Sequence, residues 1–114
     1  MAHTNYLKAG GTLKFIDTAE DDAYYFPAKN CEMIEVGPGD NTSVILTFSQ
    51  SGDNAVQNVD LTCTAGQADE IAAIMAEYIM VAGTGTGGSH GVTEFATGTA
   101  PIAAVSTIAS TKAL

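Results

Sequence analysis

A change of hydrophobic period near the middle of the chain constrains the fold more than any other feature. Over residues 42–48 and 56–64 apolar and polar side chains alternate, which is typical of strands with one buried face. A polar, Gly-containing segment at residues 49–54 separates them and predicts a hairpin loop. The residues expected on the buried faces are Val44, Leu46, Phe48, Val59, Leu61 and Cys63.

After residue 64 the apolar side chains recur at helical spacing instead. The stripe is formed by Ile71, Ile74, Met75, Tyr78 and Ile79. Asp69 and Glu70 fall near the N-terminus of this segment, where the helix dipole favours acidic side chains. Gly83 is a natural stop. We therefore expect one amphipathic helix at about residues 67–81, covering the apolar face of the sheet.

Three shorter strands are expected before this unit. Leu13 and Phe15 alternate with polar neighbours, residues 23–26 are β-prone up to Pro27, and residues 31–36 form another apolar stretch. Pro27 ends its strand or places it at a sheet edge. The Gly- and Pro-containing segment 37–41 predicts a turn.

The composition shifts abruptly after Val81. Residues 83–91 are mostly Gly, Thr and Ser, which is typical of a linker, and residues 92–114 are rich in Ala, Thr and Ser with scattered larger apolar side chains. We therefore predict an α+β body at residues 1–82, a linker at 83–91 and an extended apolar C-terminal arm at 92–114. Deletion of residues 83–114 is expected to leave a folded, soluble body that no longer assembles with or decorates its partner lattice.

The charge balance narrows the possible partners. The chain has 13 acidic residues against four lysines and no arginine, for a net charge of -9. Such a surface disfavours nucleic acid and anionic membranes, and it lacks the arginine clamp used for phosphate or carboxylate ligands. Solubility alone is the other interpretation of this acidity. We expect no membrane span and no secretory signal.

Two short glycine motifs match catalytic or cofactor patterns only in their letters. Residues 83–88 fit a dinucleotide fingerprint, but they follow a helix where a strand is needed. Residues 87–91 fit a nucleophile elbow, in a chain whose only other histidine is His3. The sequence therefore predicts no cofactor, no catalytic residues and no enzyme, although unrecognised carboxylates remain a third hypothesis.

No metal site is expected either. The soft ligands are His3, Cys31, Cys63 and His90, and no two of them have the short spacing of a zinc site. The acidic run at residues 17–22 lacks the pattern of a calcium loop, which leaves weak calcium binding open. Cys31 and Cys63 are expected to be reduced thiols, with a single bridge as the alternative.

Some apolar side chains are expected to contact a partner. Residues 24–26 are adjacent on a strand, so at least one of their rings should lie outside the core. The arm carries apolar side chains with no place to be buried in a small body. The predicted contact residues are Tyr24, Tyr25, Phe26, Val92, Phe95, Ile102, Val105, Ile108 and Leu114.

The order of strand, loop, strand and helix over residues 42–81, with Tyr6, Leu7 and Lys8 near the start, resembles short virion structural proteins of tailed phages, especially marine ones. The resemblance covers residues 23–81 and depends on layout and composition. It implies a capsid decoration (cement) protein or another minor virion protein. The implied partners are the major capsid protein or further copies of the chain. It assigns no functional residues.

We therefore expect a structural subunit of a larger assembly, located in a virion or else in the cytoplasm. The alternative is a small acidic binding or inhibitor module that docks on a basic partner. Salt would weaken the second kind of contact steeply and an apolar contact little.

Overall fold

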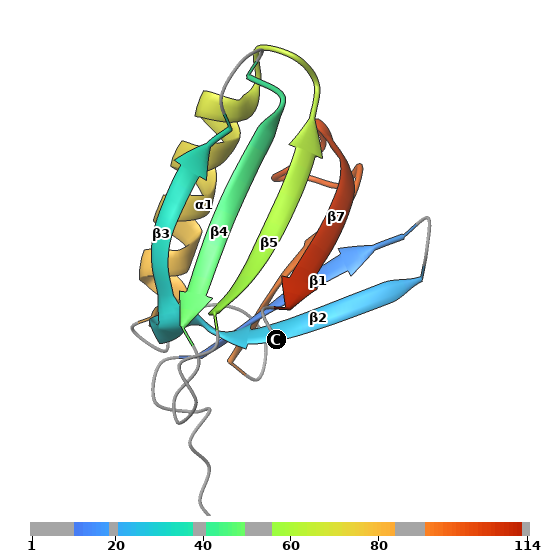
Figure 1. Ribbon diagram of the computed structural model, residues 1–114. Coiled ribbons are helices and arrows are strands. Elements are labelled where there is room, and N and C mark those ends of the chain that lie inside the picture. The colour runs from blue at the N-terminus through green and yellow to red at the C-terminus, as the bar shows by residue number, and fades with distance from the viewer. Residues whose placement is uncertain (1–10, 19–20, 38–40, 50–55, 84–90, 113–114) are drawn as a thin grey trace, which may run out of the picture.

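The computed structural model describes residues 11–18, 21–37, 41–49, 56–83 and 91–112 of the chain (Figure 1). They form a small α+β fold with one α-helix and two sheets, so the predicted fold class is confirmed. The strands are β1 (Thr12–Asp17), β2 (Asp22–Pro27), β3 (Cys31–Val36), β4 (Ser43–Ser49), β5 (Val56–Cys63), β6 (Val92–Ala96) and β7 (Val105–Lys112). The helices are the short 3-10 helix η2 (Ala28–Asn30) and α1 (Ala68–Gly83).

The larger sheet has the strand order β3-β4-β5-β7, and all its neighbouring strands are antiparallel. The predicted alternation of β4 and β5 is confirmed, because every residue expected on their inner face is buried. These inner residues are Val44, Leu46, Phe48, Val59, Leu61 and Cys63. The hairpin between β4 and β5 therefore has the register that the hydrophobic pattern requires.

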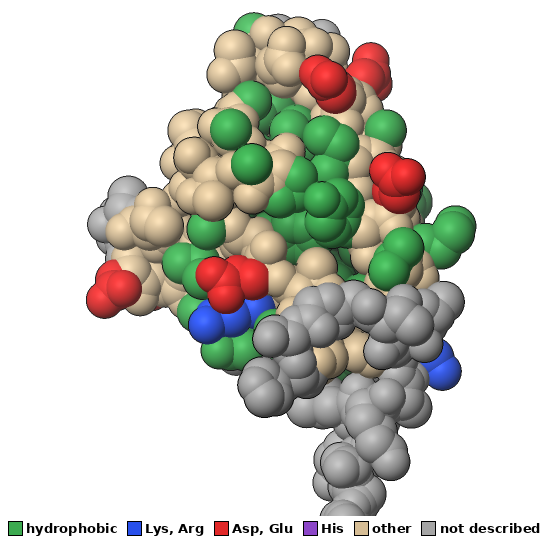
Figure 2. Space-filling model, turned by 180° about the vertical axis from the view of Figure 1, so that it is seen from behind, with side chains coloured by type: hydrophobic (Ala, Val, Ile, Leu, Met, Phe, Trp, Pro, Cys, Tyr) green, Lys and Arg blue, Asp and Glu red, His purple; other side chains and the backbone are tan. Residues whose placement is uncertain are grey.

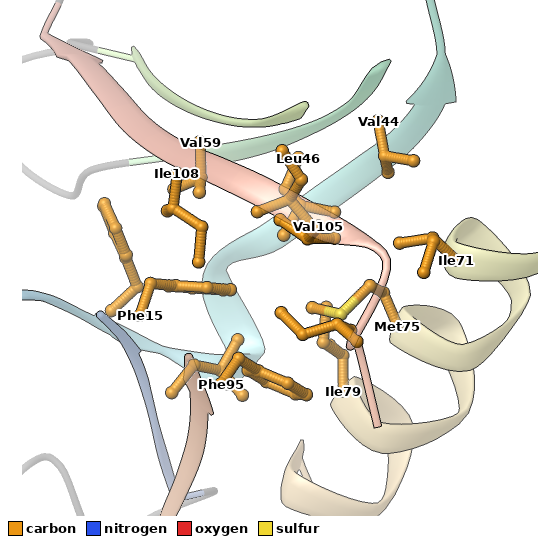
Figure 3. Packing of buried hydrophobic residues seen from close by; sticks show 14 of the residues in the cluster. Phe15, Val44, Leu46, Val59, Ile71, Met75, Ile79, Phe95, Val105 and Ile108 are labelled. Carbon is orange, nitrogen blue, oxygen red and sulfur yellow. The ribbon is translucent and has the colours of Figure 1, made fainter. Parts of the chain in front are cut away.

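Helix α1 lies behind β3 and β4 and covers part of this inner face (Figure 1). Ile71, Met75 and Ile79 are buried against the sheet (Figure 3), whereas Tyr78 is 40% exposed. The helix begins with Asp69 and Glu70 in its first turn, as expected. The amphipathic helix predicted from the sequence is therefore confirmed.

The smaller sheet has the order β2-β1-β6, and β1 pairs in parallel with β6. It is joined to the larger sheet by a cluster of phenylalanine rings. Phe15 of β1 stacks on Phe95 of β6 with ring centroids 5.4 Å apart, and Phe26 of β2 stacks on Phe48 of β4 at 4.4 Å. Phe15 also contacts Phe48 edge-to-face. Strands from both sheets therefore share one core (Figure 3).

The expectation of an extended C-terminal arm is wrong for the described residues 92–112. Strand β6 pairs with β1, and β7 pairs with β5 at the side of the larger sheet (Figure 1). Phe95, Ile102, Val105 and Ile108 are almost completely buried. Without β7, β5 would be an edge strand with unpaired backbone groups and an uncovered inner face. Completing both sheets therefore buries the apolar side chains that seemed to need another protein.

Gly11 lies where β1, η2 and the end of α1 meet. Its φ is +75°, and a Cβ there would come within 2.6 Å of the carbonyl oxygen of Ala82. The Gly11 carbonyl accepts a hydrogen bond from the Ala28 N–H at 3.1 Å. Only glycine combines this dihedral with so close an approach of two backbones.

Candidate functional site

Most of the apolar residues predicted to contact a partner are part of the protein's own core. The buried ones are Phe26, Phe95, Ile102, Val105 and Ile108, so this part of the predicted contact surface is corrected. They are not available to another protein unless the fold opens. Val92 and Tyr24 are half-buried, Tyr25 is exposed, and Leu114 lies outside the described residues.

Tyr25 confirms that one ring of the aromatic run on β2 lies outside the core, since it is 57% exposed. Its ring already has a neighbour, because Nζ of Lys14 lies 5.4 Å from the ring centroid. A hydrogen bond from Lys14 to Tyr25 raises the pKa of Lys14. On the adjacent Tyr24, burial and the nearby Asp22 raise the pKa of the phenol. The Tyr25 ring therefore already makes a cation–π contact with Lys14 of the neighbouring strand in the smaller sheet.

The two cysteines are free thiols at opposite ends of the larger sheet. Cys31 lies opposite Phe48, and the N–H of Cys63 donates to the carbonyl of Thr42. Thr42 and Phe48 are six residues apart along the same extended segment, which corresponds to about 20 Å at ~3.3 Å per residue. A disulfide needs Cα atoms within about 7 Å, so this fold holds the thiols apart. Burial raises the pKa of both, which lowers their reactivity as nucleophiles.

Among the described residues, no group of three or more His, Cys, Asp or Glu side chains is placed to hold a metal ion. His3, His90 and Glu20 lie outside the described residues, as do residues 84–90, which carry most of both glycine motifs. No helix in the described ranges is long and apolar enough to cross a bilayer.

Exposed apolar side chains are concentrated on two neighbouring elements. In the described part of the chain, five of the six large exposed apolar side chains belong to β3 or α1. These five are Met33, Val36, Tyr78, Met80 and Val81. Figure 2 shows the side of the molecule that carries α1, where apolar side chains are exposed; β3 lies behind the helix in this view. We call the exposed residues of these two elements the β3–α1 surface.

One edge of β3 is open along this surface. Strand β4 pairs with one side of β3, and no other described strand pairs with the opposite side. The Gly37 N–H donates to the Ser43 carbonyl at 2.8 Å, so Gly37 and Ser43 form a hydrogen-bonded pair of the antiparallel ladder. Every second residue of β3 from there also bonds to β4. Met33 and Glu35 therefore bond to β4, and the backbone N–H and C=O groups of Ile34 and Val36 point toward the open edge.

The same surface is acidic. Strands and helices elsewhere carry lysines, but β3 and α1 together contain five carboxylates and no lysine. These are Glu32, Glu35, Asp69, Glu70 and Glu77, and all five are exposed. The β3–α1 surface therefore combines open backbone groups, exposed apolar side chains and negative charge.

The outer face of the larger sheet is a second uncovered surface, and it has a different character. No described element lies in front of it (Figure 1). Its side chains are mostly small and polar, and the Thr47 hydroxyl donates to Oδ1 of Asn58 at 3.2 Å. In the next row Asp60 lies between Ile45 and Ala109, and its Oδ1 is shielded from solvent without a hydrogen-bond partner. Apart from Met33 at its β3 edge, this face has little apolar area to bury.

Comparison with protein-family models, with curated proteins and with solved structures found no match to this chain. The surfaces described above are therefore the basis for assigning a function.

Proposed function

We propose that this protein is a non-catalytic structural subunit of a larger protein assembly, and that it docks on its neighbours through the β3–α1 surface. The observation that carries the proposal is that five of the six large exposed apolar side chains in the described residues lie on two adjacent elements, β3 and α1. Exposed apolar side chains lose contact with water when another protein covers them, which favours association.

The narrower form of this proposal is a capsid decoration (cement) protein or another minor virion protein of a tailed phage. It is supported by the resemblance in the layout of residues 23–81. The net charge of -9 also favours contact with protein subunits over contact with a packaged genome. Because β6 and β7 belong to the body, the docking contacts come from the folded surface, and no extended arm is required.

A second candidate function is an acidic module that docks on a basic partner. It is favoured by the five carboxylates that β3 and α1 carry without any lysine. The two functions differ in their response to salt. Raising the salt concentration from 50 to 500 mM, as a rough working range, should weaken a charge-dominated contact steeply and an apolar contact little.

The proposal is tested by following the full chain among the particles of the cells or virions that contain it, using sedimentation. We expect most of it to sediment with large particles. The double variant Met33→Glu/Met80→Glu should return to the free monomer fraction, because it places charge on the apolar surface without touching the core. The control Tyr25→Glu adds charge on β2 and should stay with the particles. A wild-type chain found only as free monomer would contradict the proposal.

A further inference from the structure

We propose that the open edge of β3 binds an extended, lysine- or arginine-bearing segment of a neighbouring protein as an additional strand of the larger sheet. This inference depends on the proposed function and names the contact through which the subunit would dock. The relevant residues are Ile34 and Val36, whose backbone groups point outward, and the acidic side chains beside them.

The backbone of β3 offers a short, specific set of hydrogen bonds. Ile34 and Val36 are two residues apart, which is the spacing at which a strand directs backbone groups to the same side. Their N–H and C=O groups can therefore hydrogen-bond to the backbone of an added strand. A register shift between Cys31 and Met33 leaves Glu32 as the extra residue and ends the regular ladder there. The open edge is therefore restricted to the half of β3 that follows this shift.

The flank of α1 that faces this edge has small side chains. Tyr78 contacts Phe95 of β6 with ring centroids 5.7 Å apart, so that flank of the helix faces the smaller sheet. By helical spacing the opposite flank carries Ala72, Ala76 and Met80. An added strand beside β3 would lie over the two alanines, whose side chains are small, and against Met80, which is 73% exposed.

The charges decide which kind of segment fits. Cross-strand neighbours share a face of the sheet, so residues of an added strand would lie beside Met33 and Glu35 on the outer face. Glu32 and Glu35, with Asp69 on the same flank of α1 as Met80, give this edge a negative charge, and the lysine closest in sequence, Lys29 of η2, precedes the register shift. Lysine or arginine at alternate positions of the incoming segment would complement it.

A second copy of the chain fits the edge poorly. If two β3 strands paired with Ile34 opposite Val36, Glu35 would lie directly opposite Glu35 of the other copy. Like charges directly opposite one another destabilise a sheet, and each copy already has a net charge of -9. In this register the same glutamates that favour a basic strand oppose self-pairing.

The test uses the full chain and two synthetic ten-residue Thr/Val peptides, one with three lysines at alternate positions and one with three glutamates there. We expect the lysine peptide to slow amide hydrogen exchange at Ile34 and Val36, and the glutamate peptide to have no effect. Val36→Pro should abolish binding, because it removes an outward N–H that β4 does not use and that an edge strand can lose without unfolding. Val36→Thr keeps this N–H and should bind normally.

A charge pair of variants completes the test. Glu35→Lys should weaken binding of the lysine peptide by about tenfold or more, whereas Asp22→Lys, with the same change of net charge on β2, should change it less than about twofold. Equal effects of the two variants would show only general charge attraction and would overturn the proposal. So would unchanged binding by Val36→Pro in a variant that remains folded.

Two other occupants of the open β3 edge, a second copy of the chain or another segment of the same chain, would give different results in these experiments. A concentration-dependent dimer that Val36→Pro abolishes would assign the edge to a second copy. Strong protection of the Ile34 and Val36 amides in the dilute, peptide-free monomer would assign it to the chain itself. Either result overturns the inference. If Val36→Pro still sediments with particles while Met33→Glu/Met80→Glu does not, the edge inference fails and the proposed function stands.

Discussion

Two regions of the molecule differ from what their sequences suggest: the C-terminal segment with β6 and β7, and the side formed by β3 and α1. The first was expected to contact other proteins, but Phe95, Val105 and Ile108 are among its most deeply buried residues. The second was expected to be an ordinary part of the body, yet it carries five of the six large exposed apolar side chains of the described residues. Apolar content alone did not distinguish a segment that completes the core from a surface that remains available.

The difference follows from strand pairing. β7 lies beside β5, and β6 lies beside β1, so both strands bury their apolar side chains while they satisfy backbone groups of a neighbour. β3 has a neighbour on one side only in the described part of the chain. Its other side keeps both its backbone groups and its apolar side chains free to contact a partner.

The largest expected effect comes from deleting residues 92–114. The C-terminal strands complete both sheets, so the deletion uncovers Phe15 and Leu61 and should abolish cooperative unfolding. Circular dichroism during a urea titration measures this. A sharp transition in the truncated chain would restore the expectation of an independent body. Removal of residues 113–114 alone is the control and should preserve the transition.

A pair of point variants tests the same comparison without changing the chain length. Phe95→Ala removes a ring that is fully buried and stacked on Phe15, and it should lower the free energy of unfolding by about 3–5 kcal/mol. Met80→Ala on the exposed side should change it by less than about 0.5 kcal/mol. Urea denaturation gives both values. Similar losses for the two variants would contradict the burial on which the comparison depends.

Two glycines test how tightly the end of α1 is packed against the backbone beside β1. Both Gly11 and Gly98 have positive φ, but only Gly11 would bring a Cβ against a backbone oxygen, that of Ala82 in α1. Gly98→Ala should cost about 1–2 kcal/mol from its dihedral alone. Gly11→Ala should cost more, because the end of α1 would have to move. Thermal unfolding of both variants measures the difference, and an equal cost would indicate that α1 is not held tightly there.

The smallest expected effect concerns Cys63 and alkaline pH. Burial raises the pKa of this thiol above its ordinary value of 9.0, so the folded state keeps the proton more firmly than the unfolded chain does. Its contribution to stability is therefore present below pH 9.0 and is lost as the pH rises through the folded-state pKa. Between pH 8 and pH 10, as a rough working range, the free energy of unfolding should fall more in the wild type than in Cys63→Ala. The exposed control Thr62→Ala should follow the wild type, and parallel curves for the wild type and Cys63→Ala would contradict this assignment.

Local patterns predicted the central part of the fold correctly. The alternation in β4 and β5 and the helical spacing in α1 each involve large apolar residues at regular positions, so both the type of element and its buried face could be inferred. The shorter strands β1, β2 and β3 were also predicted. The candidate site was not, because the residues that form it, such as Met33 and Met80, are unremarkable until their exposure is known.

The C-terminal strands were missed because their signals are weak and their partners are distant. β7 has only Val105 and Ile108 as large inner residues among small polar ones, and a register shift opposite Cys63 breaks its alternation. β6 pairs with β1, which lies about 80 residues earlier in the sequence. Local periodicity contains no information about such pairing.

By itself, the sequence determined which elements form near the middle of the chain, which of their faces are apolar, and that the chain carries a large net negative charge. These properties depend on side-chain spacing over one or two turns or on simple composition. The tertiary structure alone decided that residues 92–112 complete the two sheets and that β3 retains an open edge. Hydrogen-bonding capacity is the same for every strand, so which edges are paired depends on which strands meet in space.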